Sequence, residues 1–312
     1  MAPKGLNAKY PQAYLGSMSN LENWKPWHSK QGDKGKGGSL TISPNPVTTP
    51  QEWSLAPSKS HMIRWLLLAA QGEKAVTLNF SGSPGEDVIS MARCLRQLNV
   101  EIDMSEDGWT VLGVGSEGFK RPISILHCGN SGTALRLLTI AAARLDCPVM
   151  LDGDRTLRKR HSETLLRILE YLGAKVSHGT GLESLPYLVH GPLKPGEVTI
   201  DVNRSSQPLS ALLLSMPALE GPIRVNLAGE GVSRRHAKLS FELARKTGSE
   251  NEIDWRPHII MKPWDVECPD IVEIPSDRSL ESFAILYGAV HGVQINIDNP
   301  PSKEDSLGSE IL

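Results

Sequence analysis

The stretch that decides the fold is Pro57–Ala70, PSKSHMIRWLLLAA. The serines on either side of Lys59 are favourable capping residues for the start of a helix, and a proline fits the entry to it. Nearly every position from Met62 to Ala70 is apolar, so we expect this helix to be buried on all sides. Lys59 and Arg64 nevertheless lie in its first turns, although cations are rarely buried without a partner.

Two interpretations of this stretch are open. The free N–H groups of the helix start and the flanking cations can form an anion-binding site. Alternatively, the helix is an ordinary capped core helix in which Lys59 and Arg64 extend their charged ends to solvent. Three later stretches of similar design favour the anion site.

The composition predicts an intracellular globular protein. The 312 residues allow two domains, and 39% hydrophobic residues support real cores. The net charge of −2 is unfavourable for a nucleic-acid-binding protein. We find no membrane-spanning run and no signal peptide, and we expect a cytoplasmic location. No CxxC spacing is present, so reduced, unligated thiols are expected at Cys94, Cys128, Cys147 and Cys268.

A repeated unit organises the chain. A small polar cap, an apolar helix and an alternating strand recur four times, which predicts repeated α/β units with helices beneath a sheet. The predicted helices cover 59–70, 130–143, 206–218 and 278–290, and the strands cover 75–80, 148–153, 222–227 and 293–298. The predicted caps are spaced by about 70–75 residues, as in an internal repeat: Ser60, Ser131, Ser206 and Ser279. A second helix recurs within 88–102, 165–176 and 239–248.

The second repeat begins with GNSGTALR, residues 129–136. Its glycines let a ligand approach the backbone closely, and Asn130 offers polar contacts. Arg136 follows Gly132 by four residues, as Arg64 follows Ser60 by four. An isolated arginine of this kind would simply reach solvent, but the shared offset favours a shared site.

A run of four cations lies in DGDRTLRKR, residues 152–160. Most charge runs form a solvated face. One guanidinium directed inward would bind a phosphate or carboxylate at two points. The four candidates are Arg155, Arg158, Lys159 and Arg160.

Two further polar stretches complete the set. Residues 204–207, RSSQ, place two hydroxyls and an amide at the start of the third helix, more than a simple cap requires. Residues 231–236, GVSRRH, place Ser233, two arginines and His236 after a strand. For His236, a surface position is favoured over a catalytic role.

Taken together, PSKSH…R, GNSGTALR, GD…LRKR, SSQ and VSRRH resemble the 5-enolpyruvylshikimate-3-phosphate synthase family, from about Ser39 to the end of the chain. The resemblance implies an α/β fold of β–α–β–α–β–β units in two domains, the inside-out barrel of enolpyruvyl transferases. It also implies transfer of the enolpyruvyl group of phosphoenolpyruvate to shikimate 3-phosphate with release of phosphate, a step of aromatic amino-acid biosynthesis. No cofactor, metal, nucleic acid or membrane is implied, and the complete enzyme is expected to be a monomer.

The resemblance assigns residues to the two substrates. Lys59 and Gln207 are expected to contact both. Further contacts to shikimate 3-phosphate are expected from Ser60, Arg64, Ser205, Ser206 and Ser233. Further contacts to phosphoenolpyruvate are expected from Asn130, Gly132 and Arg160.

The resemblance also implies domain boundaries, and the sequence departs from the family pattern at its C-terminal end. We expect an extension at 1–38, a strand of the second domain and a crossover at 39–56, the first domain at 57–272 and part of the second at 273–312. The strand is predicted at 39–43, SLTIS. The catalytic Asp and Glu of the family would lie beyond Leu312, so the chain is expected to be a C-terminally incomplete, inactive synthase.

Other functions stay open. The sister transferase acting on UDP-N-acetylglucosamine shares the architecture, but the SKS…R and SSQ motifs argue against it. A non-catalytic module that only holds shikimate 3-phosphate is a second alternative. A nucleic-acid-end enzyme on a related repeated fold is a third, disfavoured by the charge.

Overall fold

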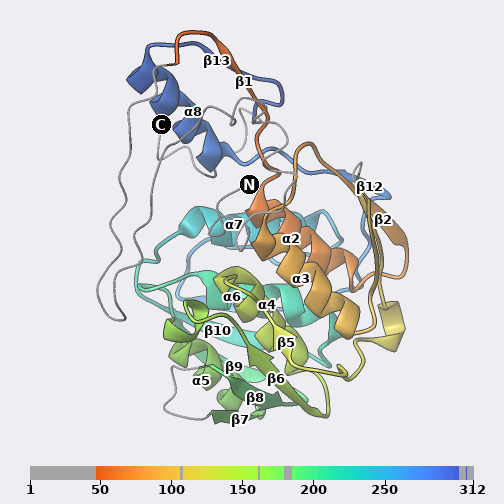
Figure 1. Cartoon of the computed structure of the whole chain (residues 1–312). Helices are drawn as coiled ribbons and strands as arrows, with labels where there is room; N and C mark the ends of the chain where they lie inside the picture. The colour runs from red at the N-terminus through yellow and green to blue at the C-terminus, as the bar shows by residue number, and fades with distance from the viewer. Residues whose placement is uncertain (1–46, 106–107, 161, 179–184, 302–306, 308–312) are drawn as a thin grey trace, which may run out of the picture.

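Three buried helices form the centre of the chain, with three small sheets arranged around them (Figure 1). The computed structural model describes residues 47–105, 108–160, 162–178, 185–301 and 307. The central helices are α2 (Lys59–Ala69), α4 (Gly132–Ala142) and α6 (Gln207–Ser215). Their leucine-rich sequences are buried almost throughout, so the expectation of a helix enclosed on all sides is confirmed. Burying each such leucine contributes about 1.5–3 kcal/mol.

Each sheet contains one parallel pair of strands extended by antiparallel strands. The first sheet has the order β12 (Ile271–Glu273), β2 (Ala75–Asn79), β4 (Trp109–Leu112) and β3 (Glu101–Met104). The second has the order β5 (Leu126–His127), β6 (Pro148–Asp152), β8 (Tyr187–His190) and β7 (Lys175–His178). The third has the order β11 (His258–Met261), β10 (Ile223–Ala228) and β9 (Gly196–Asp201). The succession β5–α4–β6–α5–β7–β8 confirms the predicted repeat and the α/β class.

A second set of helices completes the units, two of them on the central helices and the other against the strands β7 and β9. These are α3 (Glu86–Gln97), α5 (Glu163–Tyr171) and α7 (Arg234–Arg245). Each is amphipathic and buries its apolar face, as the sequence predicts. α3 packs against α2 and α4, and α7 packs against α2 and α6. In the described segments, 3₁₀ turns also connect elements: η2 (Gly115–Glu117), η3 (Leu157–Lys159) and η4 (Met216–Ala218).

The first repeat takes its leading strand from far along the chain. β12 pairs in parallel with β2, Ile271 opposite Thr77 and Glu273 opposite Asn79. β12 therefore occupies the place that β5 and β9 occupy in the other two sheets. The predicted boundary between 272 and 273 falls inside this strand, and the domain limits stay a prediction.

Two chain segments lie side by side where the polypeptide leaves the helix centre. The N–H of Ser58 donates to the carbonyl of Pro275 at 2.7 Å, and that of Asp277 donates to the carbonyl of Ala56 at 2.9 Å. Beyond them, β1 (Gln51–Trp53) pairs in parallel with β13 (Ile295–Ile297) next to α8 (Arg278–His291), at one end of the molecule (Figure 1).

The predicted caps are partly wrong. Ser58, not Ser60, occupies the N-cap of α2, and Asp277, not Ser279, caps α8 by accepting from the Ser279 N–H at 3.0 Å. The Asp277 carboxylate accepts a backbone N–H of the first turn, as N-cap residues do, so Ser279 falls inside that turn. Ser131 and Ser206 do occupy N-cap positions.

Near the N-terminus, one predicted strand is not described and one observed strand was not predicted. The strand predicted at 39–43 lies outside the described residues. The β1 strand was not predicted, because three residues are too few to show an alternating pattern. No helix in the described segments is long and apolar enough to cross a membrane.

Candidate functional site

The predicted site residues gather at the N-terminal ends of the central helices. Lys59 and Ser60 open α2, Gly132 opens α4 and Gln207 opens α6. Ser233 holds the N-cap of α7, which packs against both α2 and α6. Unpaired N–H groups and the positive ends of the helix dipoles make such a place favourable for anions.

Two arginines converge on the start of α4. A Cβ added at Gly132 would lie 2.8 Å from Nη1 of Arg136 and 2.8 Å from Nη1 of Arg160. Arg160 donates to the amide oxygen of Asn130 at 3.2 Å, and Arg136 donates to that of Gln207 at 2.5 Å. We call Asn130, Gly132, Arg136, Arg160 and Gln207 the two-arginine cluster. A side chain at this position would displace the two guanidinium groups from their present places.

The loop that carries Arg160 is held close to the loop before α4. A Cβ at Gly153 would lie 2.8 Å from the carbonyl of Gly129, so glycine permits this approach. The N–H of Asp154 donates to that same carbonyl at 2.8 Å. The Asp154 carboxylate in turn accepts from the N–H groups of Thr156 and Leu157, both at 2.8 Å. The GD pair of the motif thus shapes the turn that leads to Arg160.

Arg158, in the same cation run, is paired with an acidic residue instead. Its guanidinium forms a two-point ion pair with Asp152, whose carboxylate is almost fully buried at the end of β6. Burial by itself raises the pKa of Asp152, but the hydrogen bonds from Arg158 and the Gly153 N–H outweigh it and hold the pKa below its usual value. Arg155 and Lys159 are exposed. Arg160 is therefore the cation of this run that joins the cluster.

Replacing Arg158 with glutamine should destabilise the chain more at neutral pH than in acid. The depressed pKa of Asp152 contributes stability that is fully present above the ordinary Asp pKa of 3.8. This stability is lost as the pH falls through the lower pKa of the folded state. Urea unfolding followed by tryptophan fluorescence should separate the two proteins at pH 7, and the difference should be smaller at pH 3. Arg155→Gln is the matched control and should show no such difference. An equal gap at both pH values would contradict the assignment.

Arg64 is buried and its hydrogen-bond donors face the protein. It donates to the hydroxyl of Ser240 at 2.7 Å and to the carbonyls of Ser60 at 2.9 Å and His236 at 3.1 Å. Only 1% of it is exposed, and burial lowers its pKa to about 10. In this structure Arg64 fixes the start of α2 against α7. It lies behind Ser60 and presents little surface to a ligand.

Lys59 stands at the mouth of α2 and pairs with an acid of the neighbouring helix. Its ammonium lies 2.9 Å from the carboxylate of Asp87 on α3, with half of the lysine side chain exposed. An exposed pair of this kind contributes little stability. The ammonium can therefore exchange this partner for a bound anion at small cost.

The three serines differ in accessibility. Ser206 is fully buried, and its hydroxyl donates to the carbonyl of Ser233 at 3.0 Å. Ser205 is half-buried and accepts from the N–H of Gln207 at 3.1 Å. Ser233 is exposed and has a φ of 54°, an unusual left-handed conformation for a residue other than glycine. Its strained backbone lies next to the helix N-termini, where strain often accompanies function.

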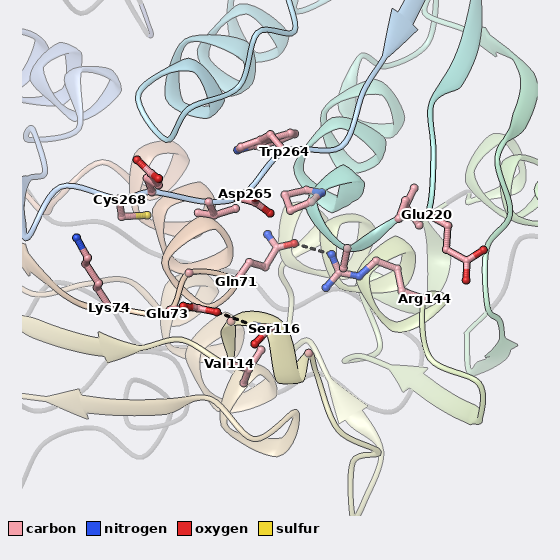
Figure 2. Close-up of a pocket in the computed structure, with 18 residues that line it drawn as sticks. Gln71, Glu73, Lys74, Val114, Ser116, Arg144, Glu220, Trp264, Asp265 and Cys268 are labelled. Atoms are coloured by element: carbon pink, nitrogen blue, oxygen red, sulfur yellow. Dashed lines mark hydrogen bonds between the residues drawn. The ribbon is translucent and has the colours of Figure 1, made fainter.

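A cavity of about 800 Å³ lies elsewhere, beyond the C-terminal ends of the same helices (Figure 2). There Arg144 donates to the side chain of Gln71 at 2.5 Å and to the carbonyl of Ser215 at 3.1 Å. Gln71 donates to the carbonyls of Leu67 and Leu214, which close α2 and α6. Among the described residues that line this cavity, none is a predicted site residue. The described segments also contain no group of three or more His, Cys, Asp or Glu placed to hold a metal ion.

The site also includes residues that the sequence alone did not assign. The sequence does point to Arg136 as a site residue, since its offset from Gly132 repeats that of Arg64 from Ser60. Thr133, whose hydroxyl accepts from the Gln207 amide at 3.2 Å, belongs to the polar part of GNSGTALR but was assigned to neither substrate. For Asp87 the sequence gives no indication of a place in the site. Polar residues near a helix start are too common to be singled out without the packing.

Comparison with known proteins identifies the family. The family model of EPSP synthase (3-phosphoshikimate 1-carboxyvinyltransferase) matches residues 50–309. A 3-phosphoshikimate 1-carboxyvinyltransferase of Vibrio campbellii is 31% identical over 83% of this chain and 61% of its own length. Those of Parasynechococcus marenigrum and Pseudomonas syringae pv. syringae are each 34% identical, over 84% and 87% of this chain and 58% and 66% of their own lengths.

The fold agrees with this match. An EPSP synthase structure from Acinetobacter baumannii superimposes with a TM-score of 0.65 at 24% identity, covering 77% of this chain and 53% of that one. The chain spans about three-fifths of the length of the first curated relatives that it matches. On the match over residues 50–309, the chain belongs to the EPSP synthase family.

Proposed function

We propose that this chain provides the shikimate 3-phosphate-binding side of an enolpyruvyl transferase. In the proposed reaction, the enolpyruvyl group of phosphoenolpyruvate passes to a hydroxyl of shikimate 3-phosphate, and inorganic phosphate is released. The relatives named above carry the corresponding name, 3-phosphoshikimate 1-carboxyvinyltransferase. Both proposed substrates are small anions, and we propose that the protein acts in the cytoplasm.

The observation that carries this proposal is the two-arginine cluster at the start of α4. Within the described residues, the hydrogen-bond acceptors of Arg136 and Arg160 are neutral: the Gly132 carbonyl and the amide oxygens of Gln207 and Asn130. Asp154 is close enough for the charge of Arg160 to help lower its pKa, but its carboxylate accepts from backbone N–H groups. Two cations that share one place and are hydrogen-bonded only to neutral acceptors favour a bound anion. We assign the phosphoenolpyruvate end of the site to this cluster.

The remaining predicted residues are assigned to shikimate 3-phosphate. Lys59 and Ser60 at α2, and Ser205 and Ser233 at α6 and α7, surround the same helix ends. Ser206 and Arg64 are buried and hold this surface in place through hydrogen bonds to the carbonyls of Ser233 and Ser60. Helix N-termini, hydroxyls and an ammonium together suit a phosphate group.

Calorimetry of the full chain with shikimate 3-phosphate tests this assignment. We expect binding in the micromolar to millimolar range and no heat with UDP-N-acetylglucosamine, the sister substrate. The absence of heat with millimolar shikimate 3-phosphate and folded protein would refute the proposal. Binding without phosphate release in the presence of phosphoenolpyruvate would favour the alternative of a non-catalytic binding module.

A substitution at Ser233 sharpens the test. Ser233→Gly removes the hydroxyl while relieving the left-handed backbone, so the fold should be as stable as before or more so. Losing one hydrogen bond to a charged phosphate, worth about 1.5–3 kcal/mol, should weaken binding roughly 10–100-fold. Asn99→Gly is the matched control, because Asn99 has a φ of 75° beyond the C-terminal end of α3. If both variants bind as the unchanged chain does, Ser233 makes no contact with the phosphate.

A further inference from the structure

A partly buried arginine beside the proposed site is bonded to the one glutamine expected to contact both substrates. Arg136, in the second turn of α4, donates through Nη1 to the Gly132 carbonyl at 3.0 Å and to Oε1 of Gln207 at 2.5 Å. Since α4 and α6 pack against each other, this bond joins their N-terminal ends (Figure 1). The bond therefore controls a side chain on a different helix.

The bond decides which way the Gln207 amide faces. A guanidinium has only donors, so the group that Gln207 turns toward Arg136 must be its oxygen. The Nε2 end then faces the other way, where it donates to the Thr133 hydroxyl at 3.2 Å. That nitrogen carries two hydrogens, so one N–H remains available beyond Thr133. A reversed amide would place N–H against N–H at Arg136 and present an oxygen instead.

We propose that Arg136 is a positioning residue that holds the Gln207 amide with its N–H toward the bound anions. This inference rests on the proposed function, because it concerns the same site. An N–H directed at a phosphate or carboxylate attracts it, whereas an amide oxygen in that place repels it. The arginine thus acts on substrate affinity through Gln207.

The setting of Arg136 supports a role beyond packing. Burial lowers the pKa of Arg136, and the like charge of Arg160 lowers it further. Both Nη1 atoms lie 2.8 Å from the position of a Cβ on Gly132. An arginine retained in an unfavourable place beside another cation is costly to the empty protein. A bound anion next to the cluster relieves that cost.

The chain contains its own comparison. Just beyond the C-terminal end of α4, Arg144 is also partly buried and also donates to a glutamine, Gln71, at 2.5 Å (Figure 2). Arg136→Met and Arg144→Met therefore remove the same kind of bond near the two ends of α4. A merely structural contribution would affect the two variants alike.

A double-mutant cycle in the full chain tests the proposal. We expect Arg136→Met and Gln207→Ala each to weaken shikimate 3-phosphate binding about tenfold in calorimetry, and the double variant to be about as weak as either one. Arg136→Lys should recover part of the loss, because an ammonium can keep one donor on Oε1. Arg144→Met should bind within twofold of the unchanged chain. Additive losses, or an equal loss in Arg144→Met, would overturn the proposal.

A second measurement does not depend on any ligand. The side-chain ¹⁵N–¹H₂ signals of Gln207, assigned from their absence in Gln207→Ala, should shift in Arg136→Met and stay in place in Arg144→Met. If the unchanged chain fails to bind shikimate 3-phosphate but these signals behave as expected, the proposed function fails and the positioning bond stands. Signals that do not move in Arg136→Met would overturn the positioning role itself.

Discussion

Arg64→Met is expected to lower the free energy of unfolding of this chain by about 3 kcal/mol, because three hydrogen bonds of a buried guanidinium are lost and each contributes about 1 kcal/mol. The guanidinium is 1% exposed and supplies hydrogen bonds to the Ser60 and His236 carbonyls and to the Ser240 hydroxyl. Methionine is comparably long and apolar, so packing changes little while these bonds are lost. Urea unfolding at pH 7 measures the difference.

Two variants separate the causes of this loss. Ser240→Ala removes one of the three partners and should cost about 1 kcal/mol. Arg64→Lys should not restore stability, since one ammonium cannot reproduce the planar fork that reaches acceptors on two helices. An Arg64→Met chain as stable as the unchanged protein would show that the contacts between α2 and α7 do not depend on this arginine.

Arg160→Ala should weaken the binding of phosphoenolpyruvate to the complex with shikimate 3-phosphate by roughly 10–100-fold, the equivalent of one charge-assisted bond of about 1.5–3 kcal/mol. Arg160 is exposed, and it bonds to Asn130 beside Gly132. Its removal should therefore leave the free energy of unfolding unchanged. Affinity for shikimate 3-phosphate alone should also stay within about twofold, because its proposed contacts lie at α2, α6 and α7.

Arg158→Ala provides the control from the same cation run. Arg158 is committed to Asp152, so its loss should affect stability at neutral pH and leave phosphoenolpyruvate binding nearly unchanged. Calorimetric titration of phosphoenolpyruvate into each variant, saturated with shikimate 3-phosphate, gives the comparison. A larger effect from Arg158→Ala or Arg155→Ala would mean that a different guanidinium faces the anion.

The α8 helix lies where the sequence predicts a helix, and it exposes an apolar face. Residues 278–290 were predicted as a helix, and α8 occupies 278–291. Within the described part of the chain, α8 buries Ala284 and leaves Phe283, Leu286 and Val290 60–70% exposed. Such a contiguous apolar face favours association. Changing Leu286 and Val290 to glutamate should shift the chain toward the monomer in sedimentation velocity, and an unchanged distribution would contradict this.

The sequence by itself determined the repeated units. Apolar runs, small polar caps and alternating strands are local signals, and each reflects burial or backbone preference over a few residues. For this reason the central helices at 59–69, 132–142 and 207–215 and the strands that follow them agree with the predictions. The motifs at the helix starts also indicated a candidate anion site from sequence alone, because the N-terminus of a helix favours anions.

Only the tertiary structure decided which side chains meet. The pairing of β12 with β2 joins segments nearly 200 residues apart, and no local pattern encodes that partner. The same holds for Arg64, whose enclosure depends on the approach of α7, and for Arg158, whose charge is satisfied by Asp152. The charge pattern alone does not distinguish four similar cations in one run, and only the resemblance to the family singled out Arg160. Their roles follow from the close approach of two loops at Gly153, which leaves Arg160 beside Gly132 and Arg136.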